Sequence, residues 1–380
     1  MIVADRLHSV KEYYFSRKLR EVRGLIAQGK PIINMGIGSP DLPPPTSALD
    51  ALNATLHQEG AHKYQSYQGL PELRAAMSNF YNERFGVEVN PENELLPLIG
   101  SKEGIMHISM AFLNVGDGVL VPNPGYPTYA SVSKLLGAEL MEYDLVEKNG
   151  WLPDIASLER HDLQKVKLMW VSYPNMPTGA KITSEKMQEL VDFANNHDIL
   201  LVNDNPYSFV LNNAPTSIFQ IKGAKRCALE LNSLSKTFNL AGWRVGMVIG
   251  NEAHVQAVLK VKSNMDSGMF YGIQKGAVAA LQSGQDWFNG LDRTYTERKD
   301  LMFQLVEKLD CSYDSHAAGM FIWAKLPKGA KPAEEFIDEV LYEKNVFIAP
   351  GTIFGSNGEG YIRFSLCVPS EKIKEAISRF

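Results

Sequence analysis

Short runs of apolar residues alternate along the chain with longer stretches in which apolar residues recur at helical spacing. The apolar runs are residues 95–99, 118–121, 167–171, 200–203, 227–231 and 245–249, and each has the length of a buried strand. Between two of these runs, Met187, Leu190, Val191 and Ala194 repeat at helical spacing after Thr183, a residue type that favours a helix start. This pattern predicts a helix over residues 183–196.

The alternation of strands and helices favours the α/β class. A chain that returns after each helix to add another strand builds a mostly parallel sheet with helices on both faces. Ligands of such sheets bind beyond the carboxyl ends of the strands. We therefore expect the functional residues to follow directly after the apolar runs.

The pattern changes after about residue 285, where a long charged helix is predicted over residues 287–309. A segment of mixed strands and helices follows and includes residues 319–324 and 360–365. The chain has 380 residues with 45% apolar side chains, which is enough for a large core and a second, smaller domain.

The net charge of -5 comes without basic blocks, so neither a nucleic acid nor a membrane surface is expected as a partner. Cys227, Cys311 and Cys367 are widely separated and odd in number, which argues against a disulfide framework or a metal cluster. Residues 1–20 lack the apolar core of a signal peptide, and no apolar run has the length of a membrane span. These features indicate a cytoplasmic protein that acts on small metabolites.

Lys236 is the first candidate for chemistry. Ser233 and Ser235 precede it and Arg244 follows it by eight positions. A lysine amine forms a Schiff base with an aldehyde, most readily where low polarity or a neighbouring cation depresses its pKa. Serine hydroxyls and a guanidinium can hold a phosphate dianion. The combination suits a covalently bound cofactor that carries a phosphate.

Further segments occur in the order that such an enzyme needs. They are residues 64–74, 100–104, 123–127, 173–179, 203–207 and 361–364. Together with the lysine segment, they resemble the class I and II aminotransferases, which are pyridoxal 5'-phosphate (PLP) enzymes of fold type I. The resemblance implies a large PLP-binding domain over residues 46–285 and a small domain formed by residues 1–45 and 286–380.

The resemblance assigns roles around the cofactor ring. Lys236 would hold PLP and later move a proton at the substrate α-carbon. Asp204 would face the pyridine nitrogen and keep it protonated. Tyr207 and Asn175 would donate to the phenolic oxygen, and Tyr126 would stack on the ring. An ordinary turn in a Pro-Asn-x-Pro segment remains the alternative for Asn175.

The phosphate is expected at the start of the helix that Gly100 precedes, where free backbone amides attract anions. The implied phosphate ligands are Gly100, Ser101, Lys102, Ser233, Ser235 and Arg244. Tyr64 matches the family tyrosine that reaches the phosphate of the neighbouring subunit. The resemblance therefore implies a homodimer with shared active sites.

Arg363 matches the arginine that clamps the α-carboxylate of the substrate. The loop over residues 31–45 would cross the site with Ile37 and Gly38, and Asn175 would also contact the substrate. The implied reaction is transamination between an L-amino acid and a 2-oxo acid, with glutamate and 2-oxoglutarate as one pair.

Among the subfamilies, the chain is most similar to LL-diaminopimelate aminotransferases and related alanine-type enzymes. This similarity rests on residues 99–105, 233–239, 261–268 and 355–361. Met176 departs from the pattern because asparagine is common at that position, and Asn205 and Pro206 replace small residues. The absence of arginine over residues 264–275 disfavours one route to strict aspartate recognition.

Three alternatives stay open on the sequence. The first is a broad alanine-, aspartate- or methionine-type aminotransferase. The second is a PLP carbon-sulfur β-lyase, which would use the same lysine, aspartate and arginine. The third, the effector domain of a transcription regulator, is disfavoured because only about 30 residues precede the Gly36 loop.

Overall fold

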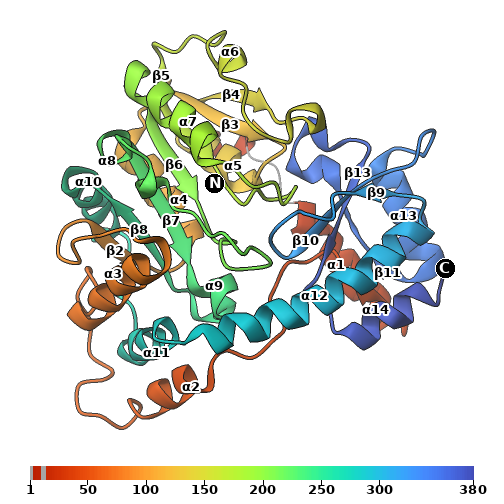
Figure 1. Cartoon of the computed structure of the whole chain (residues 1–380), viewed down its shortest axis with the longest axis horizontal. Coiled ribbons are helices and arrows are strands. Elements are labelled where there is room, and N and C mark those ends of the chain that lie inside the picture. The colour runs from red at the N-terminus through yellow and green to blue at the C-terminus, as the bar shows by residue number, and fades with distance from the viewer. Residues whose placement is uncertain (1–2, 10–13) are drawn as a thin grey trace.

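A seven-stranded sheet forms the centre of the molecule (Figure 1). The computed structural model describes residues 3–9 and 14–380. The strands are β2 (Leu95–Leu98), β3 (Gly118–Asn123), β4 (Glu139–Asp144), β5 (Val166–Val171), β6 (Leu200–Asp204), β7 (Ala228–Ser233) and β8 (Gly246–Gly250). Their order is β2-β8-β7-β6-β5-β3-β4, and only β8 runs antiparallel to its neighbours. The predicted mostly parallel α/β sheet is confirmed.

Strand β4 is the strand of this sheet that the apolar runs do not reveal. It lies at the edge next to β3, and Tyr143 is its one buried residue. An edge strand exposes most of its side chains, so its sequence carries no continuous apolar run.

Helices cover both faces of the sheet. They are α3 (Pro71–Phe85), α4 (Ser101–Phe112), α5 (Pro127–Leu135), α6 (Ile155–Leu158), α7 (Ser184–His197), α8 (Ala224–Cys227), α9 (Leu234–Thr237), α10 (Glu252–Lys262) and α11 (Tyr271–Leu281). Along β5, Leu168 and Trp170 join the apolar cluster that includes α4, whereas Met169 and Val171 join the cluster that includes α7. Successive strand residues point to opposite faces, so both faces are buried.

The helix predicted after Thr183 is confirmed as α7. The Thr183 hydroxyl accepts a hydrogen bond from the backbone amide of Lys186 at 3.2 Å. It thereby satisfies one of the amides that the first turn of a helix leaves without a partner.

A second group of elements combines the two ends of the chain. It contains the helices α1 (Tyr14–Ala27), α12 (Gln285–Lys308), α13 (Ala333–Lys344) and α14 (Ser370–Ile377), and the strands β1 (Ile33–Asn34), β9 (Ser312–Tyr313), β10 (Phe321–Lys325), β11 (Val346–Phe347), β12 (Ala349–Pro350) and β13 (Tyr361–Ser365). Strands β12, β13, β10 and β9 form an antiparallel sheet, and β1 pairs with β11 in parallel. Val22 of α1 packs against Leu341 and Phe347. The N-terminal arm therefore packs on the C-terminal segment.

Helix α12 connects the two groups of elements and crosses much of the molecule in Figure 1. Its Phe288 packs in the core of the large sheet, whereas its Leu305 packs in the core under the antiparallel sheet. The remaining helices are α2 (Thr46–Asn53) and the short 3-10 helices Asp5–Ser9, Glu147–Asn149, Ile218–Gln220, Ala241–Trp243, Gly351–Phe354 and Ser356–Gly358.

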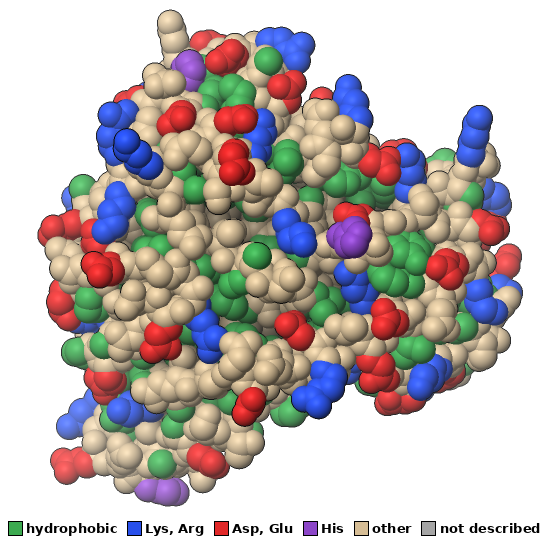
Figure 2. Space-filling model, viewed as in Figure 1, with side chains coloured by type: hydrophobic (Ala, Val, Ile, Leu, Met, Phe, Trp, Pro, Cys, Tyr) green, Lys and Arg blue, Asp and Glu red, His purple; other side chains and the backbone are tan. Residues whose placement is uncertain are grey.

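Charged side chains of both signs are mixed over the face in Figure 2. Within residues 3–9 and 14–380, no helix combines the length and the apolar character that crossing a membrane requires.

Candidate functional site

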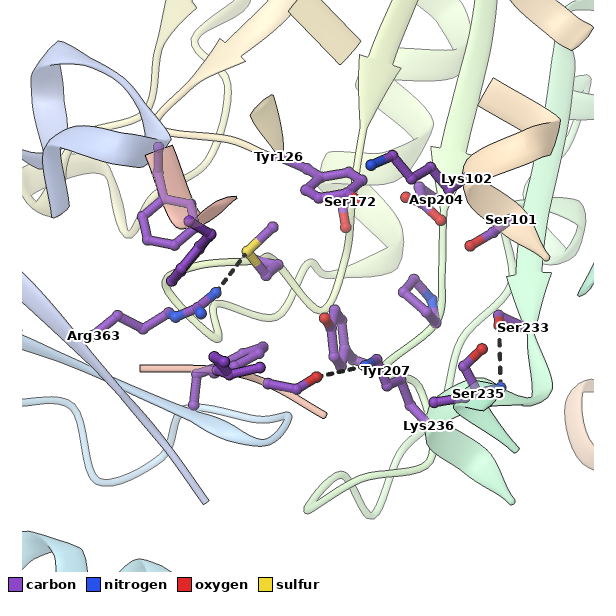
Figure 3. Close-up of a pocket in the computed structure, with 18 of the residues that line it drawn as sticks. Ser101, Lys102, Tyr126, Ser172, Asp204, Tyr207, Ser233, Ser235, Lys236 and Arg363 are labelled. Atoms are coloured by element: carbon purple, nitrogen blue, oxygen red, sulfur yellow. Dashed lines mark hydrogen bonds between the residues drawn. The ribbon is translucent and has the colours of Figure 1, made fainter. Parts of the chain in front are cut away.

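A cavity of about 550 Å³ lies where the carboxyl ends of β5, β6 and β7 meet the antiparallel sheet (Figure 3). Its lining contains Asp204 and Ser233 from the large sheet, Ser172 directly after β5, and Phe321 and Arg363 from β10 and β13. In Figure 3, Ser101, Ser233 and Ser235 lie toward one end of the space and Arg363 lies toward the other. The site thus has an end rich in hydroxyl groups and an end with a guanidinium.

Lys236 extends into the cavity from helix α9, which directly follows β7. Its Nζ donates a hydrogen bond of 2.7 Å to the backbone oxygen of Gly38. Burial lowers the pKa of Lys236 to about 8, and the positive charges of Arg363 and Arg244 act in the same direction. A substantial fraction of the amine is therefore neutral and nucleophilic near neutral pH.

Asp204 ends β6 and lines the cavity with 5% of its surface exposed. The hydroxyl of Tyr129 donates to its Oδ2 at 2.7 Å, and its buried Oδ1 has no hydrogen-bond partner. Burial raises the pKa of Asp204 to about 6. A buried acceptor without a partner is costly unless a ligand supplies a donor. The protonated pyridine nitrogen of PLP is a donor of the required kind.

The end of the cavity that lies away from Arg363 fits a phosphate. Ser101, Lys102, Ser233, Ser235 and Arg244 all line it. Helix α4 begins at Ser101, so backbone amides of its first turn are available to an anion. The hydroxyl of Ser233 donates to the Val245 oxygen at 3.3 Å and accepts from the Ser235 amide at 3.1 Å.

Gly100 lies beside this end without lining it, and its role is to allow a close approach. Its φ of +87° favours glycine, and a Cβ there would overlap the guanidinium of Arg244. Arg244 itself has a φ of 57° and donates from Nη1 to the Ala241 oxygen at 2.8 Å. The residues present therefore fit a phosphate-bearing pyridine cofactor attached to Lys236.

Two tyrosines border the space for the cofactor ring. Tyr126 and Tyr207 both line the cavity, and burial raises the pKa of both hydroxyls above the usual range. The Tyr126 ring meets the Tyr129 ring edge-on, with centroids 5.5 Å apart. Because both hydroxyls stay protonated, each can donate a hydrogen bond.

Asn175 is not among the residues that line the cavity, and the expected contacts of its side chain to cofactor and substrate stay a prediction. Its amide nitrogen donates to the Ser172 oxygen at 3.3 Å, and its amide oxygen accepts from the amide and hydroxyl of Thr178. These bonds close the turn. The neighbouring Met176 lines the cavity instead.

Tyr64 also lies away from the cavity that its own chain lines. Its side chain is 90% exposed, and it belongs to the segment after α2 that stands out from the body of the molecule in Figure 1. Within one chain, Tyr64 therefore takes no part in the site.

Arg363 lies on β13 with 4% of its surface exposed. Its Nη2 donates to the Gly36 oxygen at 2.8 Å, and its Nη1 donates to Sδ of Met176 at 3.4 Å. The guanidinium carbon is 3.9 Å from the centre of the Phe321 ring and 4.6 Å from that of Phe354. The aromatic rings hold the guanidinium in place while one edge borders the cavity.

The loop between β1 and α2 covers Lys236, as expected for residues 31–45. Ile37 and Gly38 line the cavity, and a Cβ on Gly38 would overlap the Phe321 ring. The glycine thus allows the loop to pass close to β10.

Several lining residues were missed on the sequence. They are Phe15, Leu19, Tyr129, Ser172, Met176, Pro206, Ala241, Phe321 and Phe354. Tyr129 could have been found, because it lies three positions after Tyr126 at a helix start and therefore on the same face. No local signal marks Phe15, which reaches the site from α1.

Comparisons with known proteins agree with this geometry. Residues 30–380 match the family model described as aminotransferase class I and II. An LL-diaminopimelate aminotransferase of Maridesulfovibrio salexigens is 40% identical over 99% of this chain and 98% of that protein. Another from Aquifex aeolicus is 39% identical over 99% of this chain and 97% of that protein.

Among solved structures, substrate-bound BacF from Bacillus subtilis matches with a TM-score of 0.94 at 36% identity. The match covers 100% of this chain and 97% of that chain. The resemblance inferred from the motifs and the fold type I architecture are both confirmed. The chain belongs to the class I and II aminotransferase family, and it is a PLP-dependent enzyme that acts on amino-acid and 2-oxo-acid substrates.

Proposed function

We propose that the chain transfers the amino group of LL-diaminopimelate to a 2-oxo acid, with 2-oxoglutarate as the acceptor and glutamate as the product. The observation that carries the transamination site is the placement of the Lys236 amine and the Arg363 guanidinium along one cavity, with Asp204 in its lining (Figure 3). The choice of donor is supported by the printed names of the relatives at 40% and 39% identity.

When bound, PLP supplies an electron sink for the bond that breaks at the substrate α-carbon. Lys236 holds the cofactor and its Nζ then carries the proton that leaves and returns. Asp204 offers its Oδ1 to the pyridine nitrogen, and Tyr207 donates to the phenolic oxygen. Arg363 binds the α-carboxylate, exchanging its contacts to Met176 and Gly36 for a bidentate ion pair.

The proposed phosphate ligands are the α4 amides, Ser101, Ser233, Ser235 and Arg244, with Tyr126 on the ring face. Lys102 lines the same cavity. Ile37 and Gly38 close the substrate side, and the loop that carries them excludes water. These roles are supported by position and by donor chemistry.

We also propose a homodimer in which the site is completed by the partner. Tyr64 is 90% exposed although tyrosine is usually at least half-buried, and Leu49, Tyr67 and Met265 are exposed large side chains as well. A second copy that covers them would bring the partner's Tyr64 to the phosphate. Sedimentation of the protein and of Tyr64→Phe, with PLP affinity measured on both, tests this: a monomer would contradict it.

The division into a large part over residues 46–285 and a small part formed by residues 1–45 and 286–380 remains a proposal. It is supported by separate apolar cores under the two sheets and by the packing of α1 on the C-terminal segment. Limited proteolysis within the 281–285 connection would test it. A cytoplasmic location is likewise proposed from the metabolic role.

The test of the donor is a half-reaction screen. The PLP-loaded protein is mixed singly with LL-diaminopimelate, glutamate, aspartate, alanine and methionine, and loss of the absorbance of the lysine-bound cofactor is followed. Rapid conversion by LL-diaminopimelate and glutamate supports the proposal. Conversion led by alanine or aspartate keeps transamination and discards the donor.

A transaminase needs a 2-oxo acid as acceptor for repeated turnover, and a carbon-sulfur β-lyase does not. A lyase releases pyruvate and ammonia from a suitable amino acid without any 2-oxo acid. A transaminase stops after one turnover under the same conditions, because the amino group stays on the cofactor. Multiple turnovers without an acceptor would therefore overturn the proposed reaction.

A further inference from the structure

The environment of Arg363 indicates what kind of substrate side chain lies beside it. Its Nη1 is satisfied by Sδ of Met176 at 3.4 Å, and a thioether is only a weak acceptor. An incoming carboxylate displaces such a partner at little cost. The sulfur and its methyl group then remain in the cavity as an apolar, polarisable wall.

The rest of this end of the cavity is apolar too. The Phe15 ring of α1 lies 5.7 Å from the Arg363 guanidinium carbon. Leu19 of α1, Ile37 of the covering loop and Phe354 of the 3-10 helix Gly351–Phe354 line the same cavity. Phe354 also stacks within 4.6 Å of the Arg363 guanidinium carbon, so the apolar walls are directly beside the group that holds the α-carboxylate.

Charged side chains of the lining are few. Among the described residues they are Lys102, Asp204, Lys236, Arg244 and Arg363. Asp204 is the one acidic group, and Tyr129 already binds one of its oxygens. The distal ammonium of a diamino acid thus finds no second carboxylate in the lining that one chain supplies. A chain of methylene groups, by contrast, meets aromatic and aliphatic surfaces.

We propose that Met176 is a specificity-determining residue of an apolar subsite, formed with Phe15, Leu19, Ile37 and Phe354, and that unbranched apolar amino acids are a second class of amino donor. The inference rests on the proposed transamination and adds a substrate class to it. The reaction is unchanged: the donor loses its α-amino group to the bound cofactor and leaves as the 2-oxo acid.

The subsite predicts a graded response to chain length. Burial of each methylene should raise kcat/KM about fourfold, the factor that corresponds to the transfer free energy of one methylene. We therefore expect a steady rise along alanine, 2-aminobutyrate, norvaline and norleucine, measured with the PLP-loaded enzyme and 2-oxoglutarate. All four donors share the α-carboxylate, so Arg363 contributes equally to each.

Variants at Met176 distinguish the effect of the apolar subsite from that of carboxylate binding by Arg363. Met176→Asn places a polar amide in the subsite and should make the series less steep, lowering kcat/KM for norleucine about fourfold more than for alanine. Met176→Leu is the matched control, because it keeps an apolar wall and should retain the increment per methylene. Equal slopes in Met176→Asn and Met176→Leu would overturn the assignment to Met176.

Binding provides a readout that does not depend on turnover. Hexanoate is norleucine without its amino group, and calorimetry on the PLP-loaded enzyme should find tighter binding of hexanoate than of propanoate. Met176→Asn should reduce that difference. Equal affinity for the two carboxylates would contradict the apolar subsite.

The outcomes distinguish this inference from the proposed function. If LL-diaminopimelate and glutamate react but the series is flat or unreactive, the apolar subsite is wrong and transamination stands. If no amino acid in either set converts the cofactor, the proposed transamination fails and the subsite fails with it.

Discussion

The hydroxyl of Tyr129 donates a hydrogen bond of 2.7 Å to Oδ2 of Asp204, whereas the buried Oδ1 of the same carboxylate has no hydrogen-bond partner in the described part of the chain. Tyr129 is itself held by its ring, which stacks on Trp170 with centroids 4.8 Å apart and an interplanar angle of 4°. The aspartate that we propose to face the cofactor nitrogen is therefore held in its orientation by a buried pair of stacked aromatic rings. This bond also opposes the effect of burial on the Asp204 pKa.

Tyr129→Phe should test that support, because it removes the hydroxyl and keeps the stacked ring. Loss of the donor raises the pKa of Asp204 further, so the acid limb of the kcat profile should move to higher pH. Hydrogen bonds to charged groups are worth about 2 kcal/mol, which corresponds to an expected fall in kcat of up to about thirtyfold. Tyr143→Phe is the control, since its hydroxyl donates to the Trp170 oxygen instead. An acid limb that stays in place would contradict the role of Tyr129.

Asp204→Asn should stabilise the cofactor-free protein while abolishing efficient catalysis. Burial raises the folded-state pKa to about 6 from 3.8, so the folded state binds the proton more tightly than the unfolded state. The charged carboxylate consequently destabilises the fold above pH 6, and this penalty fades as the pH falls toward 3.8.

A shift of about two units corresponds to roughly 3 kcal/mol at pH 8 as an upper limit. Urea unfolding of the cofactor-free protein at pH 8 and pH 5 measures the gain, which should be larger at pH 8. The exposed Asp192→Asn is the control. A gain that is equal at both pH values would show that Asp204 is not the titrating group.

Lys236 should capture the cofactor faster as the pH rises through about 8. Burial lowers its pKa to that value, so the neutral amine is the minor form below pH 8 and the major form above it. Mixing cofactor-free protein with PLP from pH 6.5 to 9.5 and following the absorbance change gives the profile. Lys236→Ala should give no covalent attachment and no turnover. A rate that still rises steadily up to pH 9.5, without a midpoint near 8, would show that the amine is solvated.

Arg363→Ala should weaken substrate binding and leave PLP in place. Losing both strands of a bidentate pair with a carboxylate lowers kcat/KM for every donor by about a hundredfold. Arg363→Lys restores the charge without the two-pronged geometry and should recover only part of this loss. Cofactor content by absorbance is measured in parallel. A variant that loses PLP instead would exclude the carboxylate clamp.

Local sequence patterns were sufficient to predict most strands of the large sheet. The apolar runs predicted β2, β3, β5, β6, β7 and β8, because strands buried on both faces need apolar side chains at most of their positions. Edge strand β4 lacked that requirement and was missed. The Lys236 segment could also be recognised from the sequence as a candidate cofactor site, since Ser233, Ser235 and Arg244 lie close to Lys236 in the chain.

What the sequence by itself determined were the properties set by near neighbours: strand burial, the Thr183 cap and the family motifs. Only the tertiary structure decided that Met176 lines the cavity, because the fold of the turn directs its thioether toward Arg363. It also brought Phe15 of α1 and Phe321 of β10 to the site. Their contacts arise from packing between elements distant in sequence, and no local pattern encodes where such elements meet.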